Sequence, residues 1–151
     1  MKTKRIIKDQ KGGALIEFAI VLPLLVLLVI GAIEFGILCY NKQVIANASR
    51  EGARAGIVQR VDDDGNLLLS NVEVEALIDG IVQSYCSQRL ITFGSNNPPT
   101  VASTGENGAF QQDLIVDVEY NYGFLIPSLF GLGDIIHLSA ETVMSMEAIP
   151  S

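Results

Sequence analysis

The side chain with the clearest potential for chemistry is a lone carboxylate at the start of an apolar segment. Glu17 precedes a run from Phe18 to Ile33 that contains no charged residue, and the next charge is Glu34. A carboxylate placed in hydrocarbon is costly unless it is paired or lies near the membrane surface. Two interpretations follow for Glu17: a specific ion pair, or a side chain that reaches the cytoplasmic headgroups. Glu34 is expected near the opposite membrane surface.

A second group of oxygen-bearing side chains lies further along the chain. Its spacing is that of the ligands in an EF-hand-like calcium loop: Asp62, Asp64, Asn66, Leu68, Ser70 and Glu73. Leu67 stands where such a loop requires glycine for its sharp turn. The preferred interpretation is an acidic turn that runs into a helix-capping box formed by Ser70 and Glu73. We therefore expect no bound metal and no cofactor, and calcium binding is the alternative.

No set of catalytic residues emerges from the remaining chemistry. His137 is the only histidine, and its place on the polar side of an alternating segment favours a surface role. Phosphate-binding glycine motifs and Cys/His metal clusters are missing from the sequence. Cys39 and Cys86 are expected to be free thiols, with a disulfide as the alternative. We therefore expect that the protein is not an enzyme.

The element that positions Glu17 is predicted to be a membrane-spanning helix. Residues 18–40 contain one charge, and at about 1.5 Å per residue they can cross a hydrocarbon core of about 30 Å. The stretch after the run, YNKQVIANASREGARAG, continues the helical pattern, so the apolar segment is expected to stay in the mature protein and not to be removed as a secretory signal peptide. Pro23 should kink the helix because it removes a backbone donor. The basic residues before Gly12 should keep the amino terminus in the cytoplasm.

Charge is distributed unevenly along the chain. Residues 1–12 hold five bases and one acid, which leaves five bases and sixteen acids, a net charge of −11, for the rest of the chain. A segment this acidic is a poor ligand for nucleic acid, which is bound through neutralisation of its phosphates. The acidic surface suits solvent or a protein partner.

Beyond the apolar run, the pattern predicts a small α+β domain. Helical periodicity continues to about residue 60, and a second helix is expected from about Asn71 to Arg89. A loop over 94–112, with a short strand near Val101, should precede two strands of alternating pattern. The strands begin at Asp113 and near Ile136. The apolar linker over 123–134 is expected either to fold over the core or to contact a membrane or partner.

The amino-terminal segment resembles a type IV prepilin. Five bases precede Gly12 and Gly13, and a cut between these glycines makes Glu17 the fifth residue of the mature chain. The resemblance implies cleavage by a prepilin peptidase. It also implies that Glu17 meets the free amine of the first residue of a neighbouring subunit, here Gly13.

More closely, the segment is similar to the TadE-like proteins of the tight-adherence pilus system. The matching strings are GGALIEFAIVLP, which includes Phe18 and Pro23, and ASREGAR, which includes Arg50, Glu51, Gly52 and Arg54. The resemblance covers about residues 10–58. It implies a minor pilin or pseudopilin, and it raises the expectation that the Arg50–Arg54 turn makes a specific contact within the fold or with a partner subunit.

These inferences give one expected organisation. Residues 1–12 form a cytoplasmic leader, 13–40 a transmembrane helix and 41–151 an extracytoplasmic α+β domain of a bacterial inner-membrane protein. The expected partners are prepilin peptidase, other pilin subunits, the inner-membrane assembly platform and the lipid bilayer. The alternative function is an unprocessed, signal-anchored extracytoplasmic binding or sensor domain, with a response to calcium as one option.

Overall fold

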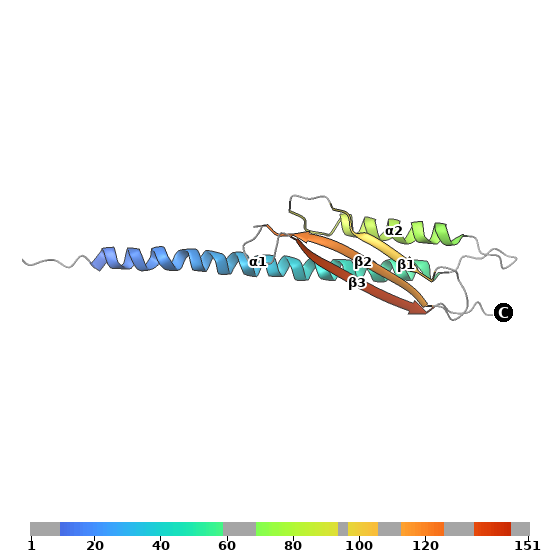
Figure 1. The fold of residues 1–151 in the computed structure, drawn as a ribbon, viewed down its shortest axis with the longest axis horizontal. Coiled ribbons are helices and arrows are strands. Elements are labelled where there is room, and N and C mark those ends of the chain that lie inside the picture. Colours follow the sequence, from blue (N-terminus) through green and yellow to red (C-terminus); the bar gives the residue numbers. More distant parts are fainter. Residues whose placement is uncertain (1–9, 59–68, 94–96, 106–112, 126–134, 146–151) are drawn as a thin grey trace, which may run out of the picture. The chain divides into compact units, whose positions relative to one another are not determined.

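The computed structural model describes residues 10–58, 69–93, 97–105, 113–125 and 135–145. Along the chain they form two helices, α1 (Gln10–Gly56) and α2 (Asn71–Ser87), followed by three strands, β1 (Thr100–Thr104), β2 (Asp113–Gly123) and β3 (Ile135–Ser145) (Figure 1). The predicted α+β class is therefore confirmed. The chain divides into two compact units, Met1–Gly36 and Ile37–Ser151, which are considered in turn.

The first unit contains the amino-terminal part of α1. Its apolar side chains from Leu15 to Val29 are exposed in the isolated chain. The helix continues through Pro23, which lies inside it. Exposed apolar side chains all around a helix require an apolar environment, because water does not solvate them favourably. From Gly12 onward, α1 is long and apolar enough to cross a membrane.

The second unit is a two-layer structure of helices on one face of a sheet. The sheet is antiparallel, with the strand order β1-β2-β3. Along β2, buried residues alternate with more exposed ones, as expected for a strand with one covered face. The predicted strand near Val101 and both alternating strands are confirmed.

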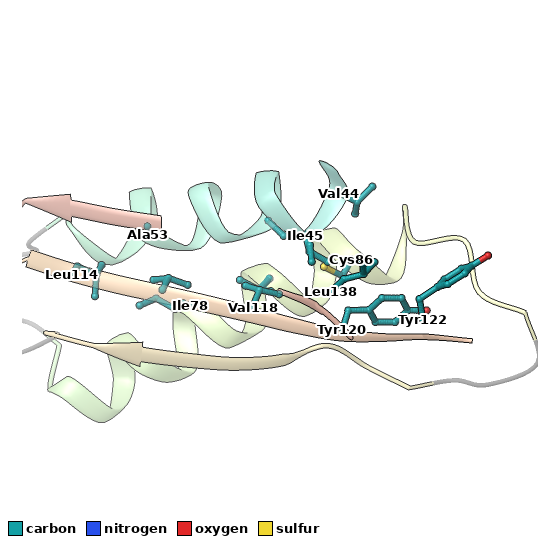
Figure 2. Packing of buried hydrophobic residues seen from close by; sticks show 13 residues of the cluster. Val44, Ile45, Ala53, Ile78, Cys86, Leu114, Val118, Tyr120, Tyr122 and Leu138 are labelled. Carbon is teal, nitrogen blue, oxygen red and sulfur yellow. The ribbon is translucent and has the colours of Figure 1, made fainter. Parts of the chain in front are cut away.

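The core lies between the covered sheet face and the two helices (Figure 2). The carboxyl-terminal part of α1 supplies residues of different size at helical spacing, from Ala48 to Ile45, and α2 supplies one residue per turn. The fully or almost fully buried members are Val44, Ile45, Ala48, Ala53, Ile78, Val82, Cys86, Leu114, Val116, Val118, Tyr120, Tyr122 and Leu138. The opposite face of the sheet is not covered by either helix.

Candidate functional site

Helix α1 carries the predicted processing segment on its exposed surface. Gly12 and Gly13 lie in the first turns, and a β-carbon placed on either glycine would have no atom within 4 Å. Glu17 and Pro23 are exposed, and Phe18 is 61% exposed. The predicted residues therefore share one accessible stretch of helix, which suits recognition by another protein or by lipid.

The carboxyl-terminal part of α1 has an inner face that is fixed by buried polar groups. Asn41 is fully buried, and its side-chain amide donates to the carbonyl of Ile91 at 2.8 Å and accepts from the Ile91 N–H at 3.0 Å. Ser49 is also fully buried, and its hydroxyl lies 2.8 Å from the Val116 carbonyl and 2.7 Å from Oγ1 of Thr142. These bonds satisfy groups that would otherwise destabilise the core.

Gly52 lies on the same inner face, where helix α1 approaches α2 closely. A β-carbon at Gly52 would lie 2.9 Å from Cγ2 of Val82 and 3.2 Å from Cγ2 of Ile78. Gly56 is equally restricted, since its β-carbon would lie 2.6 Å from Cδ2 of Leu114. The glycine of the ASREGAR string therefore has a packing role within the domain.

The charged residues of the same string point the other way. Arg54 and Glu51 form an ion pair at 2.8 Å between Nη2 and Oε1, with side chains 70% and 44% exposed. Arg50 is exposed and donates to Oδ1 of Asn47 at 3.1 Å. All these bonds stay within α1. The structure thus separates the string into an inner glycine and outer charges, and the hydrogen bonds of both arginines to described residues are made within α1.

The acidic turn lies largely outside the described residues, including Asp62, Asp64 and Asn66. Its last two members cap helix α2 as predicted. The Ser70 backbone N–H and hydroxyl both donate to Oε2 of Glu73 at 2.8 Å, and these bonds lower the pKa of the Glu73 carboxyl. Within the described part of the chain, no group of three or more His, Cys, Asp or Glu side chains is placed to hold a metal ion.

Both cysteines are free thiols, as expected. Cys86 is completely buried, and this burial raises the pKa of its thiol to about 11. Burial also raises the pKa of Tyr120, with a smaller effect of Cys86 in the same direction. His137 is exposed on β3, opposite Asn121 of β2, which confirms its surface position.

Sequence reasoning missed Asn41 and Ser49 as structural anchors. Their signal was present, because both polar residues lie on the stripe that also contains Ile45, Ala48 and Gly52. A polar residue on an apolar stripe indicates a buried hydrogen bond, but the partner belongs to a distant segment and cannot be read from local sequence.

Comparison with known proteins supports the resemblance that was read from the motifs. Residues 12–54 match the family model described as TadE-like protein. The match begins at the predicted cleavage site and ends with the charged turn of α1. No curated protein and no solved structure matches the chain significantly.

Proposed function

Because residues 12–54 match the TadE-like family, which points to a protein related to the Tad pilus, we propose that this chain is a minor pilin. It is cleaved between Gly12 and Gly13 by a prepilin peptidase and takes part in assembly of a tight-adherence pilus. It works as a structural subunit and not as an enzyme. The single observation that carries this proposal is the family match, which includes both glycines and Glu17.

The described structure is consistent with that role in two respects. The helix that follows the basic leader is able to span a membrane and exposes its apolar side chains. The same helix then continues into the small domain, so that the membrane anchor and the folded domain share one element. In this proposal the leader faces the cytoplasm, the domain lies outside the inner membrane, and other pilin subunits and the assembly platform are the partners.

Glu17 has a specific task in this proposal. After cleavage, the amine of Gly13 becomes a cation four residues from Glu17 in sequence. The carboxylate of one subunit would then meet the amine of its neighbour within the membrane, where an unpaired charge is costly. Phe18 and Pro23, exposed on the same helix, belong to the surface that neighbouring subunits would cover.

Intact-mass measurement of the full chain extracted from membranes tests the proposal. The expected product lacks residues 1–12, and Gly12→Leu should leave the uncut chain in the membrane. Gly36→Leu is the matched control, because Gly36 lies on the same helix and a β-carbon added there would have no atom within 4 Å. An uncut wild-type chain would support the alternative of a signal-anchored binding or sensor domain. A terminus beyond Ile30 would indicate ordinary signal-peptide removal.

A further inference from the structure

The sheet face that points away from the two helices carries acidic side chains, and no arginine or lysine is among its described strand residues. We use the name open sheet face for the strand residues that point away from the helices. Its charged members are Asp113, Asp117 and Glu119 on β2 and Glu141 on β3. None of the three strands contains a lysine or an arginine. The charged strand residues of the open sheet face are therefore all acidic. They share the face with uncharged residues such as Ile115 and Val143, and Lys42 of α1 donates to the Ser139 carbonyl of β3.

Two of these carboxylates oppose each other directly. Asp117 and Glu141 are register partners in the antiparallel pair, and Glu119 is the next residue of β2 on the same face. Like charges at directly opposed positions destabilise a sheet. In the described residues, the ion pair that forms is Arg54–Glu51, on a different element. A cationic surface laid on the open sheet face would relieve this repulsion.

The same domain exposes two cationic side chains on its other layer, Arg50 and Arg54. Together with the neutral residues Gln43 and Asn47 they recur at helical spacing along α1, and all four are exposed. At about 100° per residue, this outer stripe lies opposite the buried stripe that contains Ile45, Ala48 and Gly52. The outer stripe and the open sheet face are therefore on opposite sides of the two-layer unit, and neither can reach the other within one chain.

We propose that the open sheet face of one copy binds the outer stripe of α1 in a second copy. Guanidinium groups hydrogen-bond carboxylates in a forked geometry, so Arg50 and Arg54 suit the carboxylates of Asp117 and Glu141. Because the two surfaces differ, the contact is head-to-tail and can repeat into an open chain of subunits. This inference rests on the proposed assembly function, since it names the surfaces through which copies would assemble.

The acidity of the whole chain does not prevent this contact. Its net charge is spread over the surface, and at physiological ionic strength charges more than about 8 Å apart are largely screened. Paired groups within the contact lie much closer and are screened less. A metal ion is a weaker candidate for neutralising the face, because no described group of three or more acidic, His or Cys side chains is arranged to hold one.

A zero-length cross-linking experiment tests the contact. The full chain carrying Arg50→Lys and Arg54→Lys keeps both charges and gains amines that a carbodiimide couples to touching carboxylates. Heavy-isotope and ordinary copies are mixed in membranes, treated, and digested for mass spectrometry. Mixed-isotope peptides that join α1 to β2 or β3 are expected. The reagent should also form an amide bond within α1, between the lysine introduced by Arg54→Lys and Glu51. This product shows that the coupling reaction has worked.

Charge reversal then shows whether the contact is electrostatic. In an otherwise natural chain, Asp117→Lys with Glu141→Lys should lower co-purification of differently tagged copies by about tenfold, equivalent to about 1.4 kcal/mol. Glu75→Lys with Asp79→Lys is the control, because it makes the same change in charge on exposed residues of α2 and should leave co-purification unchanged. Arg50→Glu with Arg54→Glu, in an otherwise natural chain, should also lower co-purification of differently tagged copies. When chains with these two substitutions are mixed with chains that carry Asp117→Lys and Glu141→Lys, the charges are complementary again and co-purification should be restored.

The neutral variants Asp117→Asn and Glu141→Gln give a second measurement, which is useful if the chain does not fold with lysines at these positions. They should weaken association while raising the melting temperature of the chain, because the opposed charges are removed. Equal association of all variants, or cross-links to another protein in place of a second copy, would overturn the proposal. The mass of the mature chain is measured in the same samples. If the chain is cleaved normally but the copies do not associate, the contact proposed here is wrong while the pilin assignment is unaffected.

Discussion

The side-chain amide of Asn41 pairs with both the N–H and the carbonyl of Ile91, 50 residues further along the chain. The backbone of a neighbouring strand would form the same pair of hydrogen bonds with Ile91, but here a helix side chain forms both. It ties the segment after α2 to the part of α1 that enters the domain. The amide is fully buried, so the two hydrogen bonds are protected from competition with water.

Replacing Asn41 should therefore destabilise the domain. Asn41→Ala leaves the two backbone groups of Ile91 without their partner, and we expect a loss of about 1–3 kcal/mol in the free energy of unfolding. Chemical denaturation of the full chain in detergent measures it. Asn47→Ala is the control, because Asn47 is exposed on the same helix and bonds only Arg50 among described residues. Equal effects of the two substitutions would contradict the anchoring role.

A β-carbon at Gly52 should also destabilise the domain, because it would press on branched side chains that are completely buried. We expect Gly52→Ala to cost about 1–3 kcal/mol, the usual range for overpacking a core. Gly80→Ala is the matched control within α2, where the added carbon meets no atom within 4 Å. There alanine should stabilise the helix by about 0.5–1 kcal/mol. Thermal melts that shift in the same direction for both variants would refute the close packing of α1 on α2.

The buried thiol of Cys86 should make stability fall at high pH. Its pKa is raised from 9.0 to about 11 in the folded chain, so the neutral thiol is favoured by folding. The unfolded chain loses this proton first, and the contribution of Cys86 is therefore complete below pH 9 and lost as the pH rises towards 11. Denaturation curves between pH 8 and about pH 11 measure it.

Cys86→Ala is the comparison for that measurement. The variant is less stable at every pH because it leaves a cavity, but its loss of stability above pH 9 should be shallower than that of the natural chain. A thiol-alkylating reagent at about pH 8 should also leave Cys86 unmodified until the chain unfolds, because the reactive thiolate is scarce and the side chain is buried. Rapid modification of Cys86 in the folded chain would contradict its burial.

The carboxylate of Glu17 should matter for assembly and not for processing. Glu17→Gln keeps the size of the side chain and removes its charge, so cleavage should proceed while assembly weakens by an amount on the order of a few kcal/mol per contact. Intact mass reports cleavage, and recovery of sheared surface filaments reports assembly. Filaments recovered at the natural level from the Gln variant would exclude the ion pair with a neighbouring amine.

The sequence by itself determined the elements and the family resemblance. The apolar run after Glu17 predicts a membrane helix because burial in lipid requires an uninterrupted apolar surface. The alternation from Leu114 to Tyr122 predicts a strand with one covered face because side chains alternate across a sheet. The capping box of Ser70 and Glu73 marked the start of α2 at Asn71, since both residues act on backbone groups within one turn. All these signals are local, so they can be read without a fold.

Tertiary structure alone decided what the charged turn and the strands offer to other molecules. The string ASREGAR does not reveal that Gly52 faces α2 while Arg50 and Arg54 face outward, because this depends on where the second helix and the sheet pack. Nor does the sequence of the strands show that Asp117 lies opposite Glu141, because strand register is set by pairing between segments far apart in the chain. The partners of Asn41 and Ser49 are distant in sequence for the same reason: a buried polar group requires a hydrogen bond, but only the folded chain determines which group provides it.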